Sequence, residues 1–465
     1  MDFLRLIETY EKNIINSTQE IIRIKSVEDK SLPGMPFGEG PYKALEYALN
    51  LSESMGFEIK RLDGYAGHAD LGHGEESVGV LVHVDVVPEG TGWTYEPYAA
   101  EIHDGKIYGR GTIDDKGPAI AALYAMKALK ESGVELNRKI RIIFGSNEET
   151  VWGCMNHYFA NEEAPTMAFT PDADFPVIHG EKGIIVFDLT YDLDRLNDEK
   201  IKLLSLKGGN APNMVPDYAE AILEVKNIGK TESDLANFIE MHDYPISLEI
   251  EDEKVKIMAK GKSAHGSTPE KGQNAISYLM QFLEEAFEDE WDINKFFRLY
   301  NKKIGLNHHG ENIGCGFSDD VSGKLNFNPG VIKIEDGKII LTVNVRYPIK
   351  SSAEQVYEGI RNSIKGSGLE LIEDDSDMKP LYVPKDNFLV EKLMAVYREQ
   401  TEDYNSEPIT IGGGTYARAM SNAVAFGPMF PGQDDVAHQK DEYISIEHLI
   451  KLTKIYAQAL YELAK

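Results

Sequence analysis

The chain has 465 residues, of which 42% are hydrophobic and 27% charged, the composition of an ordinary globular protein. At roughly 150 residues per domain, this length predicts two or three domains. The 48 Lys and Arg residues against 77 Asp and Glu residues leave a net charge of −29. Such a charge repels phosphate backbones and anionic membrane surfaces, which argues against nucleic acid and membrane partners. A solubilising surface is one explanation of the surplus of carboxylates, and binding of divalent metal ions by some of them is the other.

Two features of the sequence predict a cytoplasmic protein. No apolar run approaches the roughly 18 residues that a membrane span needs, and the first residues, MDFLRLIETYEKN, are amphipathic and acidic, unlike a signal peptide. Cys154 and Cys315 are the only cysteines. Two cysteines far apart provide neither a disulfide framework nor a thiolate metal cluster, which suits a reducing compartment.

The first 180 residues or so alternate helix-like and strand-like stretches. Val78–Val87 is an apolar run typical of a buried strand, and residues 138–145 predict another. Residues 119–133 have apolar side chains at i, i+3 and i+4, with Gly133 placed to end the helix. This alternation predicts an α/β domain, in which a mostly parallel sheet has helices on both faces.

From about residue 183 the strands become longer and alternate apolar and polar residues, as in PISLEIEDEKVKIMAKGK and KIILTVNVRYP. Such alternation is typical of antiparallel sheets with one solvated face. After about residue 380 the α/β pattern returns and ends in the helix EHLIKLTKIYAQALYELAK. We therefore predict one domain built from residues 1–182 and 380–465, with a separate α+β domain inserted at 183–379.

Common nucleotide and nucleophile motifs do not fit this sequence. Gly109–Asp114 (GRGTID) begins like a dinucleotide fingerprint, but aspartates that would repel pyrophosphate replace the third glycine. Gly412–Ala417 (GGGTYA) matches a looser pattern too near the C-terminus to leave room for a nucleotide half-domain. The sequence has neither a G-x-S-x-G elbow nor a Walker lysine.

His83 and Asp85 stand at i and i+2 in the apolar run Val78–Val87, so their side chains project from the same face of the predicted strand. A His–Asp pair that satisfies itself within the core is one explanation. In the functional alternative His83 is a metal ligand, and Asp85 is the carboxylate that fixes its tautomer and raises its basicity.

Asp114 and Asp115 lie in YGRGTIDDKGP, just before the predicted helix. Adjacent carboxylates repel each other unless a cation lies beside them. Capping of the helix N-terminus is the structural alternative, and it suits Asp115. Asp114 is the better candidate for a carboxylate that bridges two metal ions.

Three more acidic residues follow predicted strands, and a second histidine lies in the C-terminal part of the α/β domain. Glu148 and Glu149 come directly after the strand at 138–145, and Asp172 ends the next apolar stretch. One glutamate of the pair would be ionised by a metal and the other would have a pKa suited to proton transfer, unless both are solvated loop residues. His438 lies in FPGQDDVAHQKDE and says little by itself.

The convergence of these residues is the strongest functional signal. Strand carboxyl ends meet at one edge of a parallel sheet, where open α/β proteins have their binding crevices. Imidazole and carboxylate ligands without thiolate suit catalytic Zn²⁺, with Mn²⁺ or Co²⁺ as substitutes. A shared carboxylate would hold the two ions about 3.5 to 4 Å apart, the geometry of hydrolytic two-metal sites.

The chain resembles a known family, the dinuclear zinc peptidases that include aminoacylases, carnosinases and diaminopimelate desuccinylases, and within it the bacterial peptidase V type dipeptidases. The motifs occur in the same order and cover essentially the full length, so that together they are highly specific. They are HVDVVPEGTGW, YGRGTIDDKGP, GSNEETVWG, FTPDADFPVIHGEKG, GNAPNMVPD, GKSAHGSTPEKGQNA and FPGQDDVAHQKDE.

The resemblance implies a role for each matching residue. It makes His83 and Asp172 ligands of one zinc ion, Glu149 and His438 ligands of a second, and Asp114 the bridge between them. Glu148 would be the general base and Asp85 would orient His83. In the inserted domain, His265 would polarise the scissile carbonyl, while Asn213 and Arg346 would bind the substrate's C-terminal carboxylate. A surface histidine and a charge on an edge strand are the structural alternatives for His265 and Arg346.

Three functions follow as hypotheses. The first is a metallo-dipeptidase acting on dipeptides with a free amino terminus and a free carboxylate, because family members with such substrates resemble this chain in having Asp at position 172. The second is an N-acyl amino acid deacylase or carboxypeptidase on the same scaffold, for which the family tends to have Glu. The third is a non-catalytic peptide-binding or metal-binding protein, against which Glu148 counts.

The resemblance also implies two structural features, and the length of the insert suggests a third. The inserted domain would be a lid, made of two ferredoxin-like halves, that completes the active site. Because the insert is long enough for one chain to supply this lid by itself, we expect a monomer. The Asp114–Asp115 peptide bond is expected to be cis.

Overall fold

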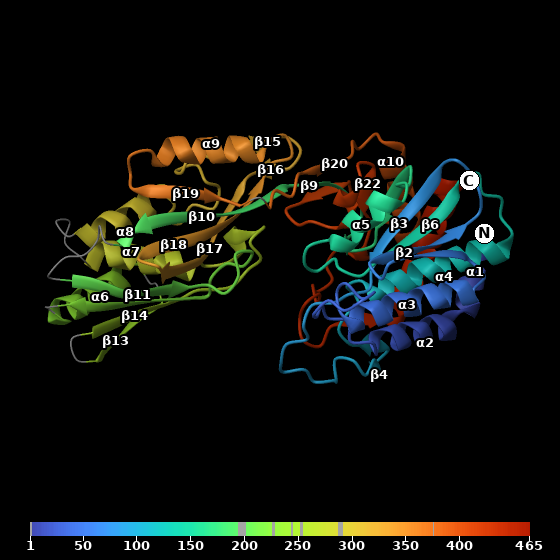
Figure 1. Ribbon diagram of the computed structural model, residues 1–465, viewed down its shortest axis with the longest axis horizontal. Helices are drawn as coiled ribbons and strands as arrows, with labels where there is room; N and C mark the ends of the chain where they lie inside the picture. Colours follow the sequence, from blue (N-terminus) through green and yellow to red (C-terminus); the bar gives the residue numbers. More distant parts are fainter. Residues whose placement is uncertain are drawn as a thin grey trace. The chain divides into compact units, whose positions relative to one another are not determined.

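The computed structural model describes residues 2–193, 201–225, 228–242, 245–251, 254–286, 292–374 and 376–465. The chain divides into two compact units (Figure 1). Unit 1 comprises Met1–His179, Tyr382–Ile409 and Gly414–Lys465, and unit 2 comprises Gly180–Leu381 and Thr410–Gly413. Each unit has its own hydrophobic core.

Unit 1 is an α/β structure around one sheet. Its helices are α1 (Asp2–Thr9), α2 (Glu11–Ile22), α3 (Glu39–Ser54), α4 (Lys116–Ser132), α5 (Gly153–Asn161), α10 (Phe388–Thr401) and α11 (Ile446–Ala464). The sheet contains β1 (Glu58–Leu62), β2 (Ala66–Leu71), β3 (Ser77–His83), β6 (Lys139–Gly145), β7 (Met167–Thr170), β9 (Ile178–Glu181), β20 (Leu381–Tyr382), β21 (Ile409–Ile411) and β22 (Ala423–Ala425). Short strands outside it are β4 (Glu101–His103), β5 (Lys106–Tyr108), β8 (Ala173–Asp174), β23 (Pro428–Met429) and β24 (Tyr443–Ser445).

The centre of this sheet is parallel. Its strand order is β1-β2-β6-β3-β7-β22-β9-β20, with β21 paired to β9. The pairs β6·β3, β3·β7 and β7·β22 are parallel, whereas β1 and β2 add antiparallel strands at one edge and β9 pairs antiparallel to β22. The prediction of a mostly parallel sheet is confirmed, and antiparallel pairs are added on both sides of its centre.

Helices cover both faces of the sheet, as alternate residues of β2 demonstrate. Gly67 faces α3, since a β-carbon there would lie 2.6 Å from Cδ1 of Leu49. The next residue, His68, faces the other way, and its Nδ1 lies 2.8 Å from the hydroxyl of Tyr158 in α5. Successive side chains of a strand point to opposite faces, so α3 and α5 lie on opposite sides of β2.

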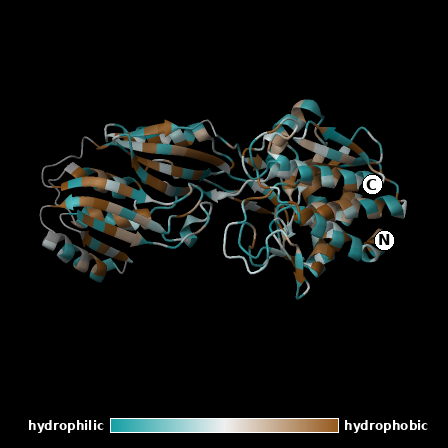
Figure 2. Cartoon of the chain, turned by 60° about the horizontal axis from the view of Figure 1, so that its bottom comes forward, coloured by the Kyte–Doolittle hydropathy of each residue, from teal (hydrophilic) through white to brown (hydrophobic). Residues whose placement is uncertain are grey.

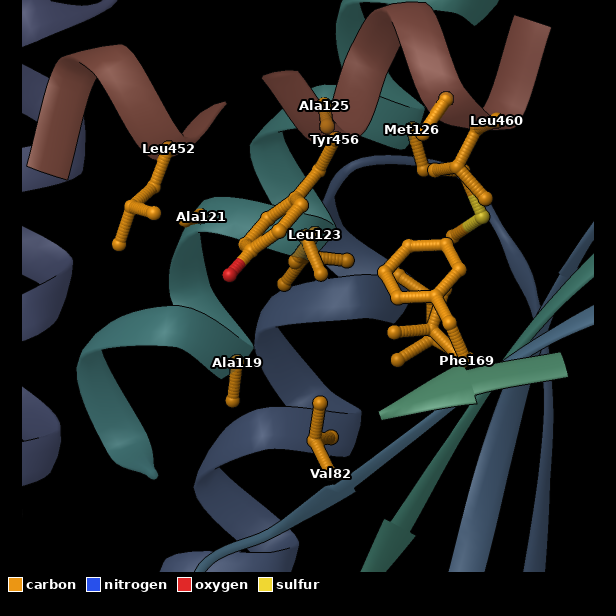
Figure 3. Close-up of a cluster of buried hydrophobic side chains, with 14 of the residues drawn as sticks. Val82, Ala119, Ala121, Leu123, Ala125, Met126, Phe169, Leu452, Tyr456 and Leu460 are labelled. Atoms are coloured by element: carbon orange, nitrogen blue, oxygen red, sulfur yellow. The ribbon is translucent and has the colours of Figure 1, made fainter. Parts of the chain in front are cut away.

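Helices α4 and α11 form the densest part of the unit 1 core. Most residues of α4 are buried, and small alanines let it pack closely against Leu452, Tyr456 and Leu460 of α11 (Figure 3). The predicted helix at 119–133 is therefore confirmed, beginning three residues earlier at Lys116. Gly133 ends it with φ of 67°, a left-handed conformation that glycine adopts without strain.

Unit 2 is an α+β structure. Its helices are α6 (Ile228–His242), α7 (Ala275–Ala286), α8 (Asp292–Lys303) and α9 (Ala353–Ile364). Its main sheet contains β10 (Gly183–Asp192), β11 (Ile201–Gly208), β12 (Tyr218–Val225), β13 (Ile246–Glu251), β14 (Lys254–Lys260), β17 (Asn326–Glu335), β18 (Lys338–Tyr347) and β19 (Leu369–Glu373), beside the small hairpin β15 (Ser318–Asp319) and β16 (Gly323–Lys324).

The unit 2 sheet has the order β13-β14-β12-β11-β17-β18-β10-β19, and all its strand pairs are antiparallel. Hydrophobic and hydrophilic residues alternate along its strands (Figure 2). In β14 the apolar residues Val255, Ile257 and Ala259 are fully buried. The α+β texture expected of the insert is present, with β11 and β17 joining its two groups of strands into one sheet.

Among the helices that the structure describes, none combines the length and the apolar character needed to cross a membrane.

Candidate metal centre and associated residues

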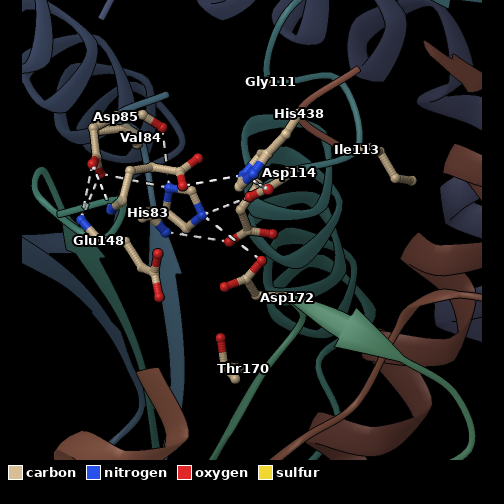
Figure 4. Close-up of polar contacts among 12 residues, drawn as sticks. His83, Val84, Asp85, Gly111, Ile113, Asp114, Glu148, Thr170, Asp172 and His438 are labelled. Atoms are coloured by element: carbon tan, nitrogen blue, oxygen red, sulfur yellow. Dashed lines mark hydrogen bonds and ion pairs between the residues drawn. The ribbon is translucent and has the colours of Figure 1, made fainter. Parts of the chain in front are cut away.

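The candidate site in unit 1 lies where its parallel strands end. His83 is the last residue of β3 and pairs in register with Gly145, the last residue of β6. Because these strands are parallel, the segments that follow them emerge at the same edge of the sheet. Glu148 and Glu149 follow β6, and Asp172 follows β7 in the same way (Figure 4).

Asp114 lies between the two histidines. Its Oδ1 is 2.9 Å from Nε2 of His83, and its Oδ2 is 2.9 Å from Nε2 of His438. Each oxygen of one carboxylate thus faces a different imidazole (Figure 4). The Asp114–Asp115 peptide bond is cis, as the family resemblance implies.

The remaining acidic residues complete a donor group around each histidine. Oε2 of Glu149 lies 3.1 Å from Nε2 of His438, and Oδ1 of Asp172 lies 3.8 Å from Nε2 of His83. His83, Glu148 and Asp172 offer donor atoms within 4.8 Å of one another, as do His83, Asp114 and Glu149. The structure therefore brings together all the unit 1 residues singled out from the sequence.

Asp85 is adjacent to His83, but its carboxylate has a different main contact from the one expected. The ring Nδ1 of His83 lies 3.0 Å from the backbone carbonyl oxygen of Asp85 and 3.5 Å from its Oδ1. The carboxylate instead accepts the backbone N–H of Glu148, at 3.0 and 2.9 Å, and that of Glu149, at 3.1 Å. Asp85 thus contacts the ring of His83 mainly through its main chain, and its side chain accepts hydrogen bonds from the Glu148–Glu149 turn.

Asp115 is a neighbour of the site and stands at the N-cap position of α4, the place that the capping alternative gave it. It precedes α4, but its side chain makes no capping hydrogen bond. It is fully buried, and its Oδ2 accepts the backbone N–H of His83 at 3.2 Å. The motif marks Asp114 as a candidate metal ligand. The hydrogen bond of Asp115 goes to a main-chain N–H 32 residues away, and such a contact leaves no signal in the sequence.

Negative charge is crowded in this site, and the pKa directions reflect it. Burial, with the nearby charge of Asp172, raises the pKa of Glu148 well above its ordinary value. Burial and the charge of Asp114 raise the pKa of Glu149 to about 7 and that of Asp172 to about 6. Burial would lower the pKa of His438, but hydrogen bonds with Asp114 and Glu149 raise it to about 11. A site of this kind attracts cations.

The donor set fits divalent metal ions. Among the described residues, the two donor groups consist of imidazole nitrogens and carboxylate oxygens and include no thiolate. Buried carboxylates are costly unless a cation or hydrogen bonds compensate them. The two oxygens of Asp114, each directed at a different imidazole, suit a carboxylate shared by two ions.

In unit 2, His265 has a defined tautomer. Its Nδ1 lies 2.6 Å from the hydroxyl of Ser267 and accepts the backbone N–H of the same residue at 3.2 Å. A backbone N–H can only donate, so Nδ1 is the acceptor and the ring proton lies on Nε2. The neutral ring therefore presents an N–H donor at Nε2, which suits a residue that polarises a carbonyl.

Asn213 lies in a loop beside His265, and Arg346 lies on β18 of the same unit. The backbone carbonyl of Asn213 accepts the N–H of Gly266 at 2.7 Å, which joins its loop to that of His265. Arg346 is only 5% exposed, and its Nε donates to Oδ1 of Asn344 at 2.9 Å. Because β18 lies inside the sheet between β17 and β10, the edge-strand alternative for Arg346 is wrong.

Lys182 and Asn326 are two further polar residues here that the sequence analysis missed. Asn326 pairs directly across the strands with Arg346, so their side chains share a face. The Nζ of Lys182 donates to Oδ1 of Asn326 at 2.6 Å, and both residues are buried. An ammonium group only donates, so the amide nitrogen of Asn326 faces away from Lys182. Lys182 stands in the HGEKG motif, whereas nothing in the sequence distinguished Asn326.

Sequence comparisons give consistent matches over the chain. The model of a family described as "Peptidase family M20/M25/M40" matches residues 79–462. A Bacillus subtilis (strain 168) protein named "Putative dipeptidase YtjP" is 42% identical over 460 residues, which cover 98% of each chain.

Solved structures with the same fold include two peptidases. Human carnosine dipeptidase 1 matches with a TM-score of 0.56 and 15% identity, covering 99% of this chain and 98% of that one. Aminoacylhistidine dipeptidase from Vibrio alginolyticus matches with a TM-score of 0.57 and 15% identity, covering 97% and 96%. At these identities the likeness concerns the fold.

Proposed function

We propose, from the premise that this chain belongs to the peptidase family M20/M25/M40, that it hydrolyses dipeptides with a free amino terminus and a free C-terminal carboxylate. The family resemblance drawn from the motifs is confirmed by this membership, and so is the assignment as a hydrolase. The relative at 42% identity carries the name of a dipeptidase. The observation that carries the proposal is Asp114, whose two oxygens each lie 2.9 Å from a different imidazole.

We propose that His83 and Asp172 hold one metal ion, that Glu149 and His438 hold a second, and that Asp114 holds both. Zinc suits this donor set, with manganese or cobalt as substitutes. When bound, such ions supply Lewis acidity that makes water nucleophilic near neutral pH and polarises a peptide carbonyl.

The protein's own groups would then manage protons and charge. Glu148 would take a proton from the attacking water and pass it to the leaving amine nitrogen, a role suited to a carboxyl whose pKa is raised by burial. The hydrogen bonds from its backbone N–H to Asp85 hold it in place. His265 would donate its Nε2 hydrogen to the carbonyl oxygen as negative charge develops there.

Asn213 and Arg346 would bind the substrate's carboxylate, for which a guanidinium fork is well matched. We propose that the inserted domain, residues 183–379, acts as a lid that brings these residues to a substrate bound by residues 1–182 and 380–465. We also propose that the enzyme works as a cytoplasmic monomer, for which sedimentation equilibrium should give a mass near 52.0 kDa. A mass near twice that value would contradict the monomer.

Chelation and substrate choice test the central proposal. We expect exhaustive chelation to abolish release of free amine from dipeptides, and added Zn²⁺ or Mn²⁺ to restore it, because the metal would activate the water that acts as the nucleophile. N-acyl amino acids should be poor substrates, since this chain has Asp at position 172, like the family members that act on a free amino terminus. Full activity of protein shown to be metal-free would refute the metal site, and preference for acyl amino acids would favour the deacylase alternative.

His265→Ala is expected to lower kcat by about 10²- to 10³-fold without changing metal content, because a donor to the developing oxyanion acts mainly in the transition state. His242→Ala is a matched control, since His242 is exposed at the end of α6 in the same unit. Steady-state kinetics on one dipeptide, with elemental analysis, would check both variants. A wild-type kcat in His265→Ala would contradict a role for this residue in the reaction.

Arg346→Met should raise KM for dipeptides by about 10- to 100-fold and abolish the preference for a free C-terminal carboxylate over its amide. The charge-assisted bonds to the carboxylate exist in ground state and transition state alike, so KM changes more than kcat. Arg361→Met, at an exposed position of helix α9, is the control. The measurement is the ratio of kcat/KM for each dipeptide and its amide, and an unchanged ratio would remove Arg346 from the carboxylate site.

A further inference from the structure

Glu442 is a fully buried carboxylate close to the candidate metal centre but outside its donor groups. It lies four residues after His438 and directly before β24. Its side chain enters the loop between β5 and α4, the loop that carries Asp114.

The carboxylate of Glu442 accepts several hydrogen bonds from that loop. Oε2 accepts the backbone N–H of Gly111 at 3.0 Å, and Oε1 accepts that of Ile113 at 2.9 Å and that of Asp114 at 3.4 Å. The guanidinium of Arg110 donates from Nη1 to Oε2 at 2.7 Å. The shape of the loop around Asp114 is thus set largely by one side chain from a distant part of the sequence.

The main chain of Glu442 joins the same two segments. Its carbonyl accepts the N–H of Gly109 at 2.9 Å, and the next residue, Tyr443, pairs with Tyr108 between β24 and β5. On its other side, Asp441 accepts the backbone N–H of Thr94 at 2.6 Å. The segment that carries His438 is therefore attached to the segment that carries Asp114 at several points.

Arg110 extends these connections to the segment that follows His83. It is 2% exposed, and its Nη2 lies 3.5 Å from the carbonyl oxygens of both Pro88 and Glu89. Its guanidinium also lies over the ring of Trp93, at 5.3 Å. The Arg110–Glu442 pair thus connects the loop of Asp114, the segment four residues after His438, and the segment five and six residues after His83.

We propose that Glu442, together with Arg110, is a positioning residue that sets the distance between Asp114 and His438 for metal binding. This inference rests on the two-metal function proposed above. A bridging carboxylate must hold both oxygens in place, and the loop that presents Asp114 lacks regular secondary structure over most of its length. Without the acceptor, several buried N–H groups would lose their partner, and the loop would shift to find new ones.

A second, largely buried ion pair in unit 1 provides a matched control. Arg141 donates to both oxygens of Asp70, at 2.8 and 2.7 Å, across the paired strands β2 and β6. Neither residue belongs to a donor group of the candidate metal centre. Removing this pair should cost stability without changing metal binding.

The test compares Glu442→Gln with Asp70→Asn in the full-length protein. Affinities for Zn²⁺ are measured by competition with a chromophoric chelator, and bound metal is counted by elemental analysis. We expect Glu442→Gln to weaken at least one of the two sites by about 10- to 100-fold, the loss typical of groups that orient metal ligands. Asp70→Asn should lower the melting temperature but keep both affinities. Unchanged affinities in folded Glu442→Gln, or an equal loss in both variants, would overturn the inference.

Arg110→Lys keeps the test decisive if Glu442→Gln does not fold. Lysine preserves the cation opposite Glu442 but cannot reach Glu442 and the carbonyls of Pro88 and Glu89 together, so an intermediate loss of Zn²⁺ affinity of about tenfold is expected. Wild-type affinity in Arg110→Lys would then overturn the inference. Failure of the proposed function looks different, because wild-type protein would itself fail to bind two ions.

Discussion

Glu148→Gln is expected to lower kcat by about 10²- to 10⁴-fold while both metal ions stay bound and KM stays near the wild-type value. Glutamine has nearly the same shape as glutamate but cannot take a proton from water. The backbone of residue 148 should remain in place, because its N–H is held by both oxygens of Asp85. Stopped-flow or steady-state kinetics on one dipeptide, with metal analysis of the same sample, would measure the effect.

Glu149→Gln is the matched comparison for this variant, since it changes the neighbouring residue in the same way. Oε2 of Glu149 lies 3.1 Å from Nε2 of His438, in the proposed second metal site. We expect this variant to lose metal as well as activity, and to recover part of its activity in excess Zn²⁺. Equal metal loss in the two variants would refute the separation of the roles of Glu148 and Glu149.

Asp114→Asn is expected to weaken metal binding by more than about 100-fold, beyond the loss typical of residues that only orient the ligands. Both oxygens of Asp114 face imidazoles at 2.9 Å, so an amide must direct its NH₂ group toward one of them. An amide nitrogen is not a metal ligand, and the variant also loses a negative charge shared by both sites. Titration with Zn²⁺ in a chelator buffer would give the affinities.

Asp104→Asn is the control for this substitution. Asp104 is exposed in the turn between β4 and β5, with φ of 49°, a conformation that asparagine also adopts readily. It should bind both ions as the wild-type protein does. Two tightly bound ions in Asp114→Asn would mean that the carboxylate does not bridge them, and that the short contacts to His83 and His438 have another purpose.

Patterns in the sequence predicted the elements of unit 1 and the residues that meet at its candidate site. Periodicity predicted α4, because a helix that packs on a sheet repeats its apolar residues every three to four positions. The positions of His83, Glu148 and Asp172 at or shortly after the ends of apolar strands predicted that they meet, because parallel strands end at one edge. These inferences depend on local patterns and on a rule of sheet topology, both of which are visible in one dimension.

Contacts between groups that are far apart in the sequence could be identified only from the folded chain. Asp85 directs its carboxylate to the backbone of Glu148, 63 residues away, and Glu442 reaches Gly111, 331 residues away. These hydrogen bonds go to main-chain N–H groups, which every residue except proline has, so no side-chain pattern marks them. Asn326 was missed for a related reason, since cross-strand pairing with Arg346 depends on the register of β17 and β18. Residue type and spacing thus predicted the chemistry of the site, whereas the orientation of its groups required the folded chain.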